Sequence, residues 1–237
     1  MTQTPGQTAP PKPERKDAPR PAPPQVPPEF QSAKIMALDS PQLVKILKDP
    51  GSTVFQKAKA CMRLAMVGTK DAVPALAALL GDEQLSHYAR FGLVPIPDPS
   101  VDDTLRGALK KFKGRLLVGV VDSIGQRKDA LAVGALTQLM YGTDADAAQA
   151  AVAALGRISG PQATTVLQGG LVKTKGPLRN AVAAAGLVCA EGLMGKGDRK
   201  GALALYDSLS RPNIPKSVRL AAMHNTIAAE TSLSRPR

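Results

Sequence analysis

Aromatic residues are scarce in this sequence: its 237 residues include no Trp, three Tyr and four Phe. Proteins that bind single-stranded nucleic acids stack the bases on aromatic rings, so this scarcity argues against that mode of binding. Only two His are present and they lie far apart in the chain, whereas a histidine-based metal site needs convergent ligands. Because no run of about 18 apolar residues occurs, the sequence also predicts no membrane-spanning segment.

The N-terminal part of the chain has too few apolar residues to form a core. Residues 1–28 hold ten of the 21 prolines and no Ile, Leu, Phe or Tyr. Burial of apolar surface therefore cannot offset the loss of chain entropy, and the prolines favour an extended, polyproline-like spacer. We predict a disordered Pro-rich tail over residues 1–32, a folded region over 33–232, and a short disordered C-terminal tail over 233–237.

The sequence is compatible with more than one cellular compartment. Residues 1–30 contain no apolar segment typical of a signal peptide. A start rich in Gln, Thr and Pro, followed by a Pro/Lys spacer, is also what often remains after signal cleavage. We expect an exported or periplasmic protein if a signal peptide precedes this start, and a cytoplasmic one otherwise.

A sequence pattern recurs along the folded region: an apolar helix that ends at Gly, a short turn, and a second amphipathic helix. The glycines of three copies are Gly68, Gly125 and Gly156, which are separated by 57 and 31 residues. These spacings correspond to two repeats and one repeat of a helix-pair solenoid. The sequence therefore predicts an all-α, right-handed solenoid of about six helix pairs. We expect Gly68 to be a left-handed helix cap and Ser40, before Pro41, to be an N-cap.

Three segments carry a resemblance to a known family. They are CMRLAMVGTKDAVPALAALLGDEQLSHYAR (61–90), PIPDPSVDDTLR (95–106) and VGVVDSIGQRKD (118–129). They resemble HEAT and HEAT-like repeats of the phycobilisome-lyase type in bacteria, and those of planctomycetes most closely. The resemblance covers about 55–170 and implies a solenoid that serves as a non-catalytic docking module. In that group such repeats often accompany haem domains, but this chain has no Cys-x-x-Cys-His motif.

The cysteines and the first histidine have simple structural interpretations. Cys61 and Cys189 lie in apolar helical contexts about four repeats apart, so we predict two buried thiols and no disulfide. His87 follows Glu83 by four positions, which predicts a pair on a helix surface.

The candidate carboxylates also favour structural roles over acid–base catalysis. Asp102 and Asp103 are expected in the first turn of a helix, where negative charge complements the helix dipole. Asp122 is expected to form hydrogen bonds between repeats, and Asp144 and Asp146 to cap a helix. We therefore predict no catalytic, metal-binding or cofactor-binding residues and no cofactor.

Positive charge is the main feature that points to a partner. The formal net charge is +12, and the tail through residue 32 contributes only +1 of it. Basic residues gather at turns that are expected to stack along one edge of the solenoid. Cations at helix C-termini would explain the same pattern without a partner. The candidate anion- or partner-binding residues are Arg106, Lys110, Lys111, Lys113, Arg115, Arg127, Lys128, Lys173, Lys175 and Arg179.

Together these features predict a non-enzymatic, monomeric scaffold that binds a protein or peptide on a groove formed by the stacked second helices. The alternative is a binder of an anionic polymer, such as DNA, RNA or an acidic wall polymer, through the basic stripe. A more remote third reading is an enzyme of the lyase or glycosylase HEAT type.

Overall fold

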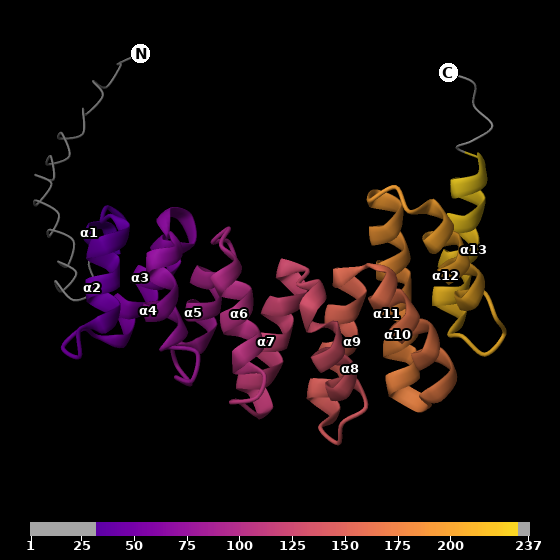
Figure 1. Cartoon of the computed structure of the whole chain (residues 1–237), viewed down its shortest axis with the longest axis horizontal. Coiled ribbons are helices and arrows are strands. Elements are labelled where there is room, and N and C mark those ends of the chain that lie inside the picture. The colour runs from indigo at the N-terminus through magenta and orange to yellow at the C-terminus, as the bar shows by residue number, and fades with distance from the viewer. Residues whose placement is uncertain (1–31, 232–237) are drawn as a thin grey trace, which may run out of the picture.

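The structure, a computed structural model, describes residues 32–231 as a stack of helix pairs. A short helix, α1 (Ser32–Met36), precedes six pairs, and no strand occurs in this part of the chain. The pairs follow one another along an arch (Figure 1). The predicted all-α solenoid of about six pairs is thus confirmed. The predicted tails, apart from Ser32, lie outside the described residues.

Each pair consists of a first and a second helix, and these two names are kept below. The first helices are α2 (Ser40–Lys48), α4 (Val73–Ala77), α6 (Pro99–Ala108), α8 (Val133–Met140), α10 (Pro161–Lys173) and α12 (Arg199–Leu209). The second helices are α3 (Val54–Val67), α5 (Ser86–Leu93), α7 (Gly114–Arg127), α9 (Ala145–Ile158), α11 (Gly176–Gly195) and α13 (Lys216–Thr231). Single 3₁₀ turns, η2 (Lys70–Ala72) and η3 (Ala130–Ala132), lead into α4 and α8.

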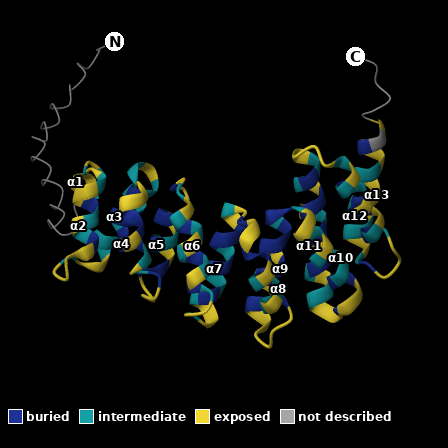
Figure 2. Ribbon diagram, viewed as in Figure 1, coloured by how far each residue is buried: buried dark blue, intermediate teal, exposed yellow. Residues whose placement is uncertain are grey.

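The turns lie on two opposite edges of the arch because successive helices run in opposite directions. The turns inside each pair lie along the outer edge, at the bottom of Figure 1. The turns between one pair and the next lie along the inner edge, at the top. Buried residues form a continuous core between the first and second helices (Figure 2).

Two predictions for helix ends need correction: Ser40 is not the N-cap of α2, and Gly68 is the C-cap of α3 as predicted but is not left-handed. The N-cap of α2 is Asp39: its carboxylate accepts from the Gln42 N–H, and the Gln42 side chain accepts from the Asp39 N–H. This reciprocal capping box makes Ser40 the first helical residue. Gly68 is extended, with φ −68°. Glycine is required there because a Cβ would lie 2.4 Å from the Leu64 carbonyl oxygen.

The second helices pack closely on one another through small residues. A Cβ on Gly125 would lie 2.8 Å from the Cα of Ala154, and a Cβ on Gly156 would lie 2.7 Å from the Ala185 carbonyl oxygen. Both glycines lie inside their helices, α7 and α9, rather than at the ends. Two of the three recurring glycines, Gly125 and Gly156, therefore permit backbone contact between neighbouring second helices.

Candidate functional site

The ten predicted basic residues do not share one edge, so that part of the prediction is wrong. The turns between α6 and α7 and between α10 and α11 lie on the outer edge, whereas the turn after α7 lies on the inner edge. The alternation of helix direction separates them. The outer edge carries Lys110, Lys111, Lys113, Arg115, Lys173, Lys175 and Arg179 at or near its turns, and the inner edge carries Arg127 and Lys128. The Arg106 side chain reaches from α6 to Asp129 in the inner-edge turn.

Arg127 is fully engaged inside the protein. Its Nε lies 2.5 Å from Asp102 Oδ1 and its Nη2 lies 2.9 Å from Asp102 Oδ2. Its Nη1 donates to the carbonyl oxygens of Val94 and Ile96, both at 2.8 Å. Only 11% of the side chain is exposed. Arg127 therefore connects α7 to the turn between α5 and α6, and its guanidinium has no N–H groups left for an external anion. Asp102 is its partner rather than a simple complement to the helix dipole.

Arg106 is engaged in the same way. Its guanidinium donates to Asp129, which precedes η3, and to Asp103 on its own helix. Asp129 is buried, and its other oxygen accepts from the Leu131 N–H. Arg106 thus connects α6 to the turn that follows α7, and its charge is neutralised locally.

Arg115 is the third of the predicted arginines in an ion pair, and its surroundings are different. It lies 3.2 Å from Glu83, and both side chains are more than three-quarters exposed. Glu83 lies in a turn before α5, because Asp82 accepts hydrogen bonds from the Gln84 and Leu85 N–H groups there. The predicted pair between Glu83 and His87 on a helix surface is therefore wrong.

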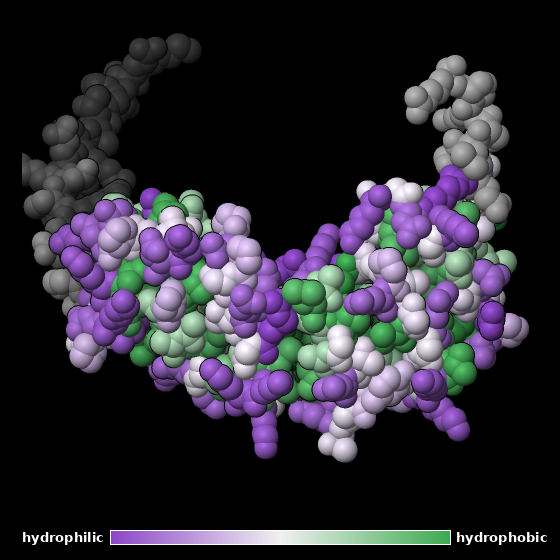
Figure 3. Space-filling view, viewed as in Figure 1, coloured by the Kyte–Doolittle hydropathy of each residue, from purple (hydrophilic) through white to green (hydrophobic). Residues whose placement is uncertain are grey.

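Five of the predicted lysines lie exposed at the outer edge and form no ion pair with any described residue: Lys110, Lys111, Lys113, Lys173 and Lys175. Hydrophilic side chains project along this edge below α6 and α7 (Figure 3). On the outer edge these lysines are the predicted residues free to meet an anion, and Lys128 is likewise exposed and without an ion pair to a described residue on the inner edge.

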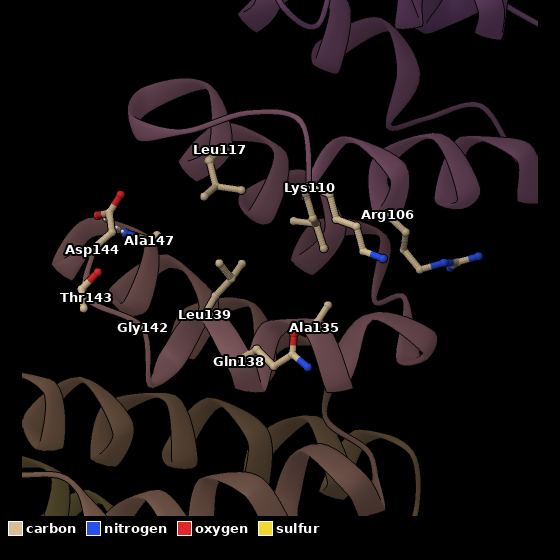
Figure 4. Close-up of a pocket in the computed structure, with 11 residues that line it drawn as sticks. Arg106, Lys110, Leu117, Ala135, Gln138, Leu139, Gly142, Thr143, Asp144 and Ala147 are labelled. Atoms are coloured by element: carbon tan, nitrogen blue, oxygen red, sulfur yellow. Dashed lines mark hydrogen bonds between the residues drawn. The ribbon is translucent and has the colours of Figure 1, made fainter.

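A pocket opens at the outer edge where the α6–α7 pair meets the α8–α9 pair. Its volume is about 350 Å³. Leu109, Leu117 and Leu139 supply apolar walls, and Lys110 and Asp144 lie at its rim (Figure 4). Asp144 is the N-cap of α9, as predicted, and Asp146 lies in the first turn of that helix.

The exposed face of the second helices carries a different set of side chains. Arg157 on α9 donates to Asp122 on α7 at 2.6 Å, so the predicted role of Asp122 between repeats is confirmed. Arg90 on α5 covers Gly119 and donates to Ser86 Oγ at 2.6 Å. Burial lowers the pKa of Arg90, and the nearby Asp122 carboxylate opposes that shift. A small hollow of about 100 Å³ lies beside these groups.

Both cysteines are free and buried, as predicted. Burial raises the pKa of the Cys61 thiol to about 12 and also raises that of Cys189. Such thiols are protonated at neutral pH and are poor nucleophiles.

We therefore expect neither thiol to react with an aromatic disulfide reagent at about pH 8 until the protein unfolds. Because the thiol pKa is higher in the folded state than in the unfolded state, this difference favours the folded state fully below about pH 8.5. The contribution is lost as the pH rises toward the folded-state pKa. Stopped-flow absorbance measures the rate at which the thiols react with the reagent, once in native buffer and once in denaturant. Fast reaction of either thiol in native buffer would contradict the buried positions.

The remaining ionisable groups show no convergent chemistry. The His87 and Tyr88 rings form an edge contact at 5.6 Å, and His224 lies beside Asn225. Within residues 32–231, no group of three or more His, Cys, Asp or Glu side chains is placed to hold a metal ion. In the same part of the chain, no helix combines the length and apolar character that a bilayer crossing requires.

The role of arginines in connecting repeats was not predicted from the sequence. Arg127 and Arg157 both lie near the C-terminus of a second helix, and each binds an Asp at least 25 residues earlier. Lys196, at the end of α11, likewise donates to the carbonyl oxygens of Ile158 and Ser159. A basic residue recurring at the end of second helices was the signal in the sequence that could have indicated these contacts.

Comparisons with known proteins add only a likeness of fold. No protein-family model matches the chain, and no curated protein matches it. A solved engineered protein is 17% identical, with a TM-score of 0.46 over 80% of this chain and 97% of that chain. YibA of E. coli is 16% identical, with a TM-score of 0.47 over 90% of this chain and 81% of its own. Human deoxyhypusine hydroxylase, solved with glycerol, is 12% identical, with a TM-score of 0.42 over 85% and 97%. At these values no activity is transferred to this chain.

Proposed function

We propose that this protein is a non-enzymatic scaffold of the HEAT-like type that binds a protein or peptide partner on the exposed face of its second helices. The observation that carries the proposal is the composition of that face. It exposes Met66 on α3, Phe91 on α5 and Val188 on α11, and Phe91 lines a hollow together with the partly buried cation Arg90. Exposed apolar side chains flanked by cations are typical of protein-binding surfaces, whose central residues exclude water.

Replacing Phe91 by Asp tests this proposal, because the Phe91 side chain is 51% exposed and its loss should leave the core intact. With the full chain as bait, we expect a protein partner that survives a high-salt wash and is lost with the F91D variant. Val172→Asp is the matched control, since Val172 is 80% exposed on a first helix. Retention by F91D, or equal loss with V172D, would contradict a site on the second-helix face.

A second candidate function is the binding of an anionic polymer along the outer edge. It is favoured by the five unpaired lysines at the turns of α6–α7 and α10–α11. Each phosphate that a lysine neutralises releases counterions, so such binding weakens steeply as salt rises.

For this second candidate we expect Lys110→Gln/Lys111→Gln to weaken binding to a DNA duplex by about tenfold and to lower the salt slope by about 2. The measurement is a fluorescence-anisotropy titration at several salt concentrations. Lys128→Gln/Lys200→Gln removes the same charge from exposed residues at the inner edge and is the control. Equal effects of the two double variants would indicate a response to net charge alone.

A further inference from the structure

The pocket between α6 and α8 is lined by groups that differ in charge from one end to the other. Lys110 and Arg106 lie at one end, and Asp144 and Thr143 at the opposite end (Figure 4). Leu117 lies between these ends together with Leu139. The pocket is therefore basic at one end, apolar in the middle and acidic at the other end.

Only some of these charges are available to a ligand. Arg106 already donates to Asp103 and Asp129, so Lys110 provides the free positive charge at its end. At the other end, Asp144 Oδ1 accepts from the N–H groups of Asp146 and Ala147. No described residue donates to Asp144 Oδ2, which leaves one carboxylate oxygen for an incoming cation.

The apolar centre lies between helices that belong to different pairs. α6 packs on α7 and α8 packs on α9, and the pocket lies where the two pairs meet. Leu117, in the first turn of α7, and Leu139, on α8, face the same space. A volume of about 350 Å³ accommodates a large aliphatic or aromatic side chain together with adjacent backbone.

We propose that this pocket binds a short peptide segment of a partner protein in which one or two apolar residues separate an acidic from a basic side chain. The acidic group pairs with Lys110, the apolar side chain fills the space between Leu117 and Leu139, and the basic group pairs with Asp144. A polyanion does not satisfy this arrangement, since Asp144 repels it. The pocket lies on the outer edge, so this site is separate from the proposed face of the second helices.

Three tetrapeptides test the charge order: acetyl-Glu-Leu-Leu-Lys-amide, acetyl-Glu-Leu-Leu-Glu-amide and acetyl-Lys-Leu-Leu-Lys-amide. Titration into the ¹⁵N-labelled full chain, followed by backbone amide shifts, gives both the affinity and the location. We expect the bipolar peptide to bind at least about threefold more tightly than either single-sign peptide, with shifts confined to 106–117 and 135–147. Absence of binding, or equal affinity for all three, overturns the proposal.

One charge variant should invert the expected preference and a second should abolish it. Lys110→Glu should favour the all-basic peptide over the bipolar one, because both ends of the pocket are then acidic. Asp144→Asn should remove the preference for the bipolar over the all-acidic peptide, because a neutral amide neither attracts the Lys nor repels the second Glu, and Asn is as good an N-cap as Asp, so α9 is retained. Lys111→Glu is the matched control, since Lys111 is exposed in the same turn and does not line the pocket. An equal effect of K110E and K111E overturns the proposal in favour of general electrostatics.

Discussion

Replacing Arg127 by Ala is expected to lower the free energy of unfolding by about 3–5 kcal/mol. The guanidinium is nearly buried, pairs with both oxygens of Asp102, and satisfies the carbonyl oxygens of Val94 and Ile96. Its removal leaves a carboxylate and two carbonyls without donors where water has little access. Chemical denaturation followed by circular dichroism measures the loss.

Two further variants separate this effect from loss of positive charge. Arg115→Ala removes an ion pair whose two side chains are 77% and 79% exposed, and should cost no more than about 1 kcal/mol. Arg127→Lys keeps the charge but cannot form the paired contacts of the planar guanidinium, so it should remain clearly destabilised. If R127A were no more destabilised than R115A, Arg127 would not connect the repeats as described.

Replacing Gly156 by Ala should destabilise the protein by about 1–3 kcal/mol, although alanine is the better helix former. The added Cβ would lie 2.7 Å from the Ala185 carbonyl oxygen, which belongs to the backbone of α11 and cannot rotate away. The second helices α9 and α11 would have to separate. Thermal unfolding of the variant should show a lower Tm.

Gly169→Ala is the matched control for this prediction. Gly169 also lies inside a helix, α10, but nothing lies within 4 Å of the position of its Cβ. This substitution should stabilise the protein by about 0.5–1 kcal/mol, because glycine loses more backbone entropy on folding than alanine. A stabilised G156A variant would show that α9 and α11 do not need to approach this closely.

The repeat order and the helical class could be predicted because they depend on local sequence. Ala- and Leu-rich segments with helical periodicity recur at a spacing near that of a helix pair. Capping also depends on neighbours along the chain, and Asp144 was predicted correctly on that basis. Asp39 was not predicted as the N-cap, because its capping box with Gln42 begins one residue before the Ser40–Pro41 pair on which the prediction was based.

The role of the recurring glycines could not be predicted from local sequence. The recurring pattern placed Gly125 and Gly156 at helix ends, yet both lie inside second helices against the backbone of the next repeat. Glycine is favoured both at helix ends and at close backbone contacts, and the sequence pattern does not distinguish the two uses. Only the packing of α7 on α9, and of α9 on α11, decides between them.

The sequence alone determined that this chain is a basic, all-α repeat protein, because composition, periodicity and charge are local or additive properties. The tertiary structure decided which charges remain free. Arg106 and Arg127 find carboxylates 23 and 25 residues away, whereas Lys110 finds none among the described residues and lies at the rim of a pocket. The physical reason is that a charge is neutralised by its neighbours in space. In a solenoid those neighbours are set by the alternating direction of the helices and by the contact between adjacent repeats.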